Sequence, residues 1–153
     1  MTTPAPTIHA TAVLLGHCGI LIRGPSGSGK SRLALSLLQS AGGGFARLVG
    51  DDRIHLEAVH GRLLMRPATA LAGLIEVRGL GVVRRPFEPV AVAELVVDLA
   101  AADSGRLPEQ AATTVDMLGI RLARLPVAPG VDPKPLLLDF LRGSAGDKHS
   151  SAM

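Results

Sequence analysis

The stretch Gly24-Pro25-Ser26-Gly27-Ser28-Gly29-Lys30-Ser31 follows the complete pattern of a phosphate-binding loop, G-x-x-x-x-G-K-[ST]. Glycines permit backbone turns with positive φ and leave room for several N–H groups to converge on one cluster of phosphate oxygens. In such a loop the lysine reaches the β- and γ-phosphates, and the final hydroxyl holds Mg²⁺. The stretch therefore predicts a nucleotide-binding loop with Lys30 as a phosphate ligand and Ser31 as a metal ligand.

The segments on either side of this loop have the required character. Residues 19–23 read Gly-Ile-Leu-Ile-Arg, a short apolar run suited to a buried strand. Residues 31–40 place an apolar stripe on one side of a helix, which we expect Gly42-Gly43-Gly44 to end. A strand, a loop and a helix in this order are the context that the motif needs. The open alternative is a chance glycine-rich turn between a strand and a helix.

The remaining sequence predicts an α/β protein, a mixed β-sheet core with packed helices, in one domain. Hydrophobic periodicity and turn residues predict strands at 7–15, 45–50, 54–59, 62–65, 93–99, 114–117 and 121–127. Asp132 can cap a last helix over 133–142, which we expect to stop at Gly143. With no internal repeat or linker, we expect a flexible leader at 1–8, a catalytic domain at 9–142 and a flexible tail at 143–153.

The composition narrows the function classes. The 153 residues include 47% apolar residues and only 2% aromatic residues, so an aliphatic core is expected. A net charge of +3 and the scarcity of stacking aromatics argue against a nucleic-acid partner. No apolar run is long enough for a membrane span, and no secretory signal pattern is present. Cys18 is the only cysteine, which excludes an internal disulfide and fits a cytoplasmic protein.

Two adjacent acids, Asp51 and Asp52, follow the apolar residues 48–50. An acid after a second strand can hold Mg²⁺ in a nucleotide hydrolase, or accept the proton of a substrate hydroxyl in a kinase. Neighbouring side chains in an extended segment point in opposite directions, so we expect one of the two to face the γ-phosphate. The alternative is a polar strand end with a capping role.

Glu76 and Arg78 lie two residues apart in Ile75-Glu76-Val77-Arg78-Gly79, so an extended segment would place them on one face. One could bind metal while the other binds phosphate, or the two could form a salt bridge on a solvated face. His9 precedes the first strand, and a lone histidine is more often a surface residue than a catalyst. The other histidines show no metal-ligand spacing, so the sequence offers no zinc site.

Three motifs together resemble the C-terminal catalytic domain of HPr kinase/phosphorylase over residues 9–142. His9 lies 15 residues before Gly24, the spacing that the family shows between its histidine and its phosphate loop. Leu48-Val49-Gly50-Asp51-Asp52 is similar to the family's L-V-A-D-D. Residues 75–83, Ile-Glu-Val-Arg-Gly-Leu-Gly-Val-Val, resemble the family signature [LI]-E-[IV]-R-G-x-G-[IV]-[IV].

The resemblance implies a P-loop core similar to that of phosphoenolpyruvate carboxykinase. It implies ATP-dependent, Mg²⁺-assisted phosphorylation of a serine on HPr or an HPr-like phosphocarrier of the phosphotransferase system, and the reverse phosphorolysis. Asp52 would be the general base, His9 would tune Asp52, and Glu76 would join Ser31 as a metal ligand. Arg106 corresponds to a later active-site arginine, and Arg78 would contribute to nucleotide binding. A hexamer is also implied.

The departures from the family pattern bear on the reverse reaction and on regulation. The late loop reads Pro126-Val127-Ala128-Pro129-Gly130-Val131-Asp132, without the two arginines of the family's P-V-R-P-G-R-N. Pro25 replaces the usual acid of the phosphate loop. Because only eight residues precede His9, the chain resembles a short form of the family without an N-terminal domain. A nucleotide-binding regulator with weak or no phosphotransfer remains an alternative, as does a small-molecule kinase or an ATPase.

Overall fold

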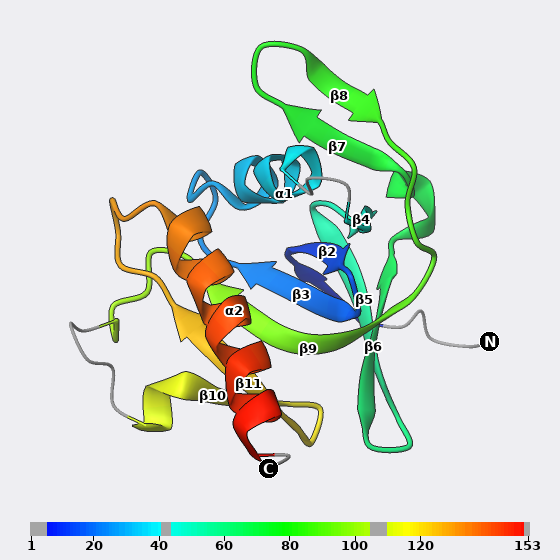
Figure 1. The fold of residues 1–153 in the computed structure, drawn as a ribbon. Helices are drawn as coiled ribbons and strands as arrows, with labels where there is room; N and C mark the ends of the chain where they lie inside the picture. Colours follow the sequence, from blue (N-terminus) through cyan, green and yellow to red (C-terminus); the bar gives the residue numbers. More distant parts are fainter. Residues whose placement is uncertain (1–5, 41–43, 105–109, 152–153) are drawn as a thin grey trace.

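The computed structural model describes residues 6–40, 44–104 and 110–151, and these residues form a large mixed sheet with helices packed against it (Figure 1). The helices are α1 (Lys30–Gln39) and α2 (Pro133–Ser151), with short 3-10 turns η1 (Thr69–Leu71) and η2 (Gln110–Thr113). Within these residues, no helix is both long and apolar enough to cross a membrane.

The strands of the large sheet come from both halves of the chain. They are β1 (Thr7–His9), β2 (Thr11–Leu15), β3 (Cys18–Arg23), β4 (Ala46–Gly50), β5 (Arg53–Val59), β6 (Arg62–Pro67), β9 (Ala91–Asp98), β10 (Thr114–Met117) and β11 (Ile120–Pro126). Their spatial order is β1-β5-β6-β9-β3-β2-β4, with β11 paired to β9 and β10 paired to β11. The long strand β9 runs antiparallel to β6 but parallel to both β3 and β11. The carboxyl ends of β3, β9 and β11 therefore meet at one edge of the sheet.

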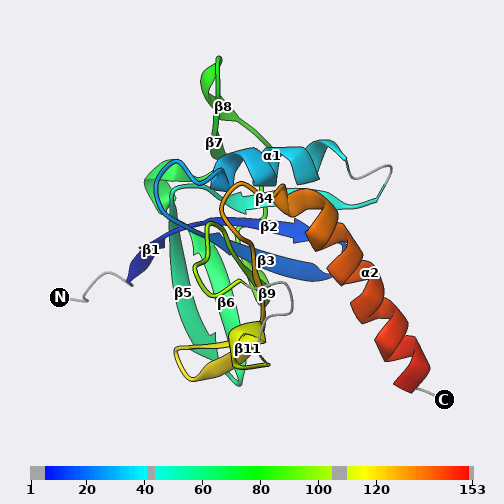
Figure 2. The same cartoon turned by 90° about the vertical axis from the view of Figure 1, so that its left-hand side faces the viewer.

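Two apolar clusters fill the two faces of the sheet. Because successive side chains of a strand point to opposite faces, Ile20 and Ile22 join one cluster while Leu21 joins the other. The first cluster lies under the helices and includes Leu37 of α1 and Leu137 of α2. Figure 2 shows α1 lying across the sheet and α2 extending away beside it. The loop before α1 therefore connects a buried strand of the sheet to a helix packed on its face.

A separate two-stranded hairpin stands beyond α1 (Figures 1 and 2). It consists of β7 (Leu74–Val77) and β8 (Gly81–Arg84) in antiparallel register. Ile75 is buried in the cluster under α1, whereas Leu80 and Val82 are 74% and 66% exposed. One face of the hairpin is therefore anchored in the core while its tip projects outward.

The structure differs from the sequence-based expectations in three places. The strand expected over 7–15 is divided at Ala10, because β1 pairs with β5 while β2 pairs with β3 and β4. Thr7 and Ile8, which we assigned to the leader, are consequently part of the sheet. The last helix does not stop at Gly143 but continues to Ser151. A glycine inside a helix costs about 1 kcal/mol relative to alanine, which weakens a helix without requiring its end.

Candidate active site

The Gly24–Ser31 loop connects the end of β3 to the start of α1, as the sequence predicts. Gly29, the residue before the helix, has φ 99°, a left-handed conformation that favours glycine. At Gly24 the constraint is space, because an added Cβ would lie 2.5 Å from Ser28 Oγ. The first backbone N–H groups of α1 have no partner within the helix and converge at this loop. The arrangement is suited to an anion.

Lys30 lies inside this loop. The residue is only 7% exposed, and its Nζ donates hydrogen bonds to Gly24 O at 2.9 Å and to Pro25 O at 3.1 Å. Ser28 Oγ is also buried, and it has no hydrogen-bond partner among the described residues. A buried hydroxyl without a partner costs free energy, which a bound acceptor would remove. The loop thus holds a positive charge and a free donor close to the helix N-terminus.

Asp51 follows the end of β4 and connects three parts of the molecule. Its side chain accepts hydrogen bonds from Thr11 Oγ1 at 2.7 Å and from the backbone N–H of Glu76 at 3.1 Å. Ser31 Oγ donates to Asp51 Oδ1 and Oδ2 at 2.7 and 2.9 Å. Asp51 is only 6% exposed. Its carboxylate is held in place by hydrogen-bond donors on β2, α1 and β7. Asp51 was not among the site residues expected from the sequence, although its position after a second strand is a signal for a metal-binding or catalytic acid.

Asp52, unlike the buried Asp51, is exposed to solvent. Its φ of 73° turns the chain sharply, and the side chain lies 61% exposed with Oδ1 at 2.9 Å from His9 Nε2. His9 comes from β1 and is itself 44% exposed on its side chain. The two acids therefore diverge as expected, but through a left-handed turn rather than through extended strand geometry. One carboxylate is buried beside the loop, and the next is open to solvent with a histidine beside it.

The structure brings Glu76 to the site through its backbone. The Glu76 N–H contacts Asp51, whereas the Glu76 side chain is exposed. The expectation that Glu76 and Arg78 share an extended face is wrong, because β7 ends at Val77 and Arg78 lies in the following turn. Arg106 lies outside the described residues. Across 6–40, 44–104 and 110–151, no group of three or more His, Cys, Asp or Glu residues is suited to a metal ion.

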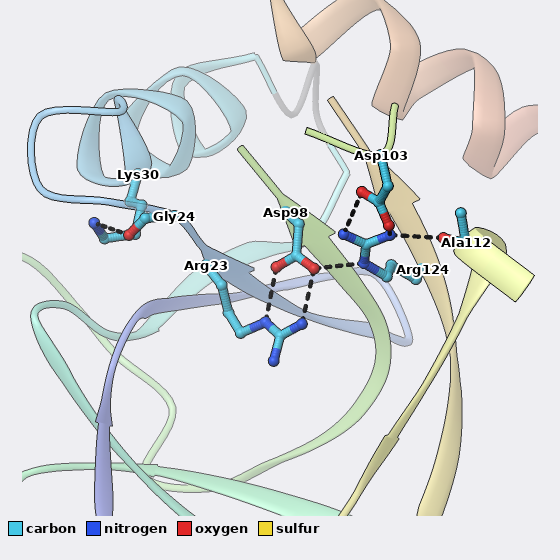
Figure 3. A network of polar contacts seen from close by, with 7 residues as sticks. All are labelled: Arg23, Gly24, Lys30, Asp98, Asp103, Ala112 and Arg124. Carbon is cyan, nitrogen blue, oxygen red and sulfur yellow. Dashed lines mark hydrogen bonds and ion pairs between the residues drawn. The ribbon is translucent and has the colours of Figure 1, made fainter. Parts of the chain in front are cut away.

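A network of arginines and aspartates lies at the base of the loop (Figure 3). Asp98, at the end of β9, accepts two hydrogen bonds of 2.7 Å from Arg23, the last residue of β3. Arg124 of β11 donates its Nε to the same carboxylate and its Nη atoms to Asp103, at 2.8 and 3.0 Å. Arg124 Nη1 also donates to Ala112 O at 2.8 Å. No local sequence pattern indicates this network, because Arg23 and Asp98 are 75 residues apart.

Burial and ion pairing act in opposite directions on Asp98. Burial raises the pKa of its carboxyl group, but the hydrogen bonds from Arg23 and Arg124 and the charges of both guanidinium groups outweigh burial and hold that pKa below its ordinary value. The same contacts raise the pKa of Arg124, with the hydrogen bond to Asp103 as the largest cause. The network is therefore fully ionised at neutral pH.

The fold and site define an α/β protein with a glycine-rich loop before a helix and an acid pair at the end of a neighbouring strand. The family model described as HPr Serine kinase C-terminal domain matches residues 2–137. This chain belongs to that family.

Known relatives agree with this assignment. The chain is 37% identical over 141 residues to HPr kinase/phosphorylase of Bordetella pertussis, covering 83% of this chain and 44% of that protein. It is 31% identical over 143 residues to the protein of the same name from Halalkalibacterium halodurans, again covering 83% and 44%. The chain thus spans less than half the length of these relatives.

A solved structure shows the same fold. The Hpr(Ser) kinase/phosphatase from Coxiella burnetii superposes with a TM-score of 0.77 and 23% sequence identity. The match covers 96% of this chain and 94% of the Coxiella chain. The mixed sheet and its packed helices therefore belong to a fold that this neighbour shares.

Proposed function

We propose that this protein is an ATP-dependent serine kinase that phosphorylates HPr or an HPr-like phosphocarrier of the phosphotransferase system. The observation that carries the proposal is the contact between Ser31 and Asp51, because the exposed Asp52 directly follows Asp51 in the chain and would therefore lie near the glycine-rich loop. Family membership supplies the reaction class, and the names of the relatives supply HPr as the substrate.

ATP would bind with its phosphates at the Gly24–Ser31 loop. Converging backbone N–H groups, the helix N-terminus and the Lys30 ammonium group would neutralise the phosphate charge. We infer that this core is similar to the nucleotide-binding core of phosphoenolpyruvate carboxykinase. Arg78, exposed in the turn after β7, is available to contact the nucleotide from outside the loop.

The residues around Asp51 fit a Mg²⁺ ion by their chemistry. Mg²⁺ prefers hard oxygen ligands, and Ser31 contributes a hydroxyl while Asp51 contributes a carboxylate. Glu76, whose backbone N–H contacts Asp51, would add a second carboxylate after a change of side-chain rotamer. When bound, Mg²⁺ neutralises charge on the transferring phosphoryl group. The ion would replace the Ser31 proton as the partner of Asp51.

Asp52 would act as the general base. A serine hydroxyl is a poor nucleophile at neutral pH, so a carboxylate that accepts its proton as the phosphoryl group transfers raises the rate by roughly 10²–10⁴-fold. Asp52 is suited to this role because its carboxylate is exposed to an incoming protein substrate. The contact between His9 Nε2 and Asp52 Oδ1 would orient Asp52 and leave its second carboxylate oxygen available to accept the proton.

The same geometry is compatible with the reverse reaction. Protonated Asp52 would return the proton to the serine oxygen while inorganic phosphate attacks phosphoserine and leaves as pyrophosphate. Arg106 would stabilise the charge on the transferring group. The loop at residues 127–132 carries no arginine, so we expect phosphorolysis to be slower than phosphorylation.

A second candidate is a nucleotide-binding regulator that transfers phosphate slowly or not at all. The observation that favours it is the same late loop, where the exposed Val131 stands in place of an arginine of the family pattern. The two candidates share the nucleotide site and differ in the fate of the γ-phosphate.

The deciding experiment incubates the purified protein with Mg-ATP and HPr and looks for phosphoserine by mass spectrometry. Phosphoserine on HPr that disappears with Asp52→Asn supports the kinase, and nucleotide binding without transfer supports the regulator. A second incubation with phosphoserine-HPr and inorganic phosphate, assayed for pyrophosphate, measures the reverse step. We further propose a cytoplasmic homo-oligomer, a hexamer by resemblance, with its catalytic unit at 9–142 between terminal segments 1–8 and 143–153.

A further inference from the structure

The end of β3 is joined to two neighbouring strands just before the glycine-rich loop begins. Leu99 N donates to Arg23 O at 2.8 Å, and Val127 N donates to Asp98 O at 2.8 Å. These backbone bonds continue the parallel pairing of β9 with β3 and β11 up to the edge of the sheet. The side chains of Arg23, Asp98 and Arg124 add a second connection across the same three strands (Figure 3).

The charges of this cluster balance only when Asp98 is present. The Arg23 and Arg124 side chains are 31% and 12% exposed, and both contact Asp98, whose side chain is 13% exposed. Asp103 supplies the second negative charge, and among the described residues its ion pair is with Arg124 and not with Arg23. Without the Asp98 carboxylate, Arg23 would lose both described hydrogen bonds and face another guanidinium group across a poorly solvated gap.

The geometry of the Gly24–Ser31 loop depends on the position of its first residue, Gly24. Gly24 follows Arg23 directly, and Gly24 O and Pro25 O are the acceptors that hold Lys30 Nζ. Gly24 also packs against Leu99, the residue that follows β9, since an added Cβ would lie 3.1 Å from Leu99 Cβ. A shift of the Arg23 backbone would therefore move the carbonyl groups that position the Lys30 ammonium group.

We propose that Asp98 is a positioning residue for the Gly24–Ser31 loop, which it holds through Arg23 so that Lys30 stays in its binding position. Arg124 supports Asp98 from the other side and ties it to Asp103 and to Ala112 O. The proposal rests on the proposed function only for the identity of the ligand, because the order of the empty loop can be measured without one.

The test compares Asp98→Asn with Asp116→Asn in the full chain. Asp116 pairs with Arg121 across the β10–β11 hairpin in an exposed position, so its variant also breaks an Asp–Arg pair, but away from the loop. We expect Asp98→Asn to accelerate hydrogen–deuterium exchange at the amides of Gly24 and residues 26–30. It should also raise the Kd of a fluorescent Mg-ATP analogue about tenfold, as the loss of charge-assisted contacts implies. Asp116→Asn should leave both quantities unchanged.

A second pair of variants guards against a general loss of folding. Arg23→Gln removes the contact between β3 and Asp98 while Asp98 keeps Arg124, and it should reproduce the faster loop exchange. Arg23→Lys keeps one charged donor and should restore part of the protection. Unchanged loop exchange in Arg23→Gln, or exchange that rises equally in β2 and β4, would overturn the proposal. A wild-type protein that binds no nucleotide would instead contradict the proposed function, while the exchange result would still decide the role of Asp98.

Discussion

Ser31 Oγ donates to both carboxylate oxygens of Asp51, at distances of 2.7 and 2.9 Å. This contact joins the start of α1 to the end of β4, so the two segments that would bind phosphate and metal lie next to each other. The carboxylate of Asp51 is buried and held by its donors, whereas the side chain of the next residue, Asp52, is exposed. This difference in burial between two adjacent acids is the central feature of the site.

Asp52→Asn should separate binding from phosphoryl transfer. The amide keeps the shape of the side chain but cannot accept the serine proton, so transfer to HPr should fall by roughly 10²–10⁴-fold. The Kd for Mg-ATP should stay close to that of the wild type, because Asp52 lies outside the loop. Single-turnover transfer and equilibrium binding measure the two quantities. Equal losses in both would assign Asp52 a metal-binding or structural role instead.

Lys30→Ala should weaken nucleotide binding and transfer together. The variant removes the only charged side chain of the Gly24–Ser31 loop. It also leaves the carbonyl groups of Gly24 and Pro25 without the hydrogen bonds that Lys30 donates. Lys134→Ala is the matched control, because Lys134 sits at the start of α2 and contacts Ser40 rather than the loop. Binding of a fluorescent nucleotide should distinguish them, and equal effects of the two substitutions would contradict the assigned role of Lys30.

Thr11→Val should destabilise the protein by about 1–3 kcal/mol, the typical cost of leaving a buried polar group without its partner. Thr11 is fully buried on β2, and its hydroxyl donates to Asp51 at 2.7 Å. Valine preserves the shape and the β-propensity of the position. Thr114→Val on the exposed surface of β10 provides the comparison and should change the free energy of unfolding very little. Urea denaturation of both variants measures the difference; similar values would mean that the hydroxyl contributes nothing.

Asp98 should make the stability of the protein dependent on acid pH. The pKa of Asp98 is lower in the folded protein than its ordinary value of about 3.9, so its ion pairs stabilise the fold above that value. This contribution should be lost as the pH falls from about 3.9 through the lower folded pKa, because the unfolded chain then binds the proton first. Unfolding free energies of wild type and Asp98→Asn, measured from pH 7 downward, should converge in that range. A difference that stays constant down to pH 2 would exclude this linkage.

Local patterns predicted the elements around the loop well. The strand before Gly24, the helix after it and the hairpin turn at residues 60–61 all occur as expected. Asp132 Oδ1 accepts from Lys134 N at 3.2 Å, which matches the expected cap of the last helix. These features depend on residues close in sequence, whose backbone preferences and side-chain periodicity act over a few positions.

Longer-range relationships could not be obtained in this way. The sequence could not tell which of Asp51 and Asp52 would be buried, because that depends on Thr11, which is 40 residues from Asp51 along the chain. It also placed Glu76 and Arg78 on one face, whereas the end of β7 at Val77 separates them. β7 ends where its pairing with β8 ends, at the Val77–Gly81 pair, and the chain then turns over residues 78–80.

The sequence by itself determined the glycine-rich loop, its flanking strand and helix, and the motifs of the family, because each is written in residues that are near one another. Only the tertiary structure decided that Asp51 bonds to Ser31, that Asp52 faces His9, and that Asp98 joins Arg23 to Arg124. Those contacts join residues that are far apart along the chain. Their side chains come within hydrogen-bonding distance only after the strands have packed into one sheet.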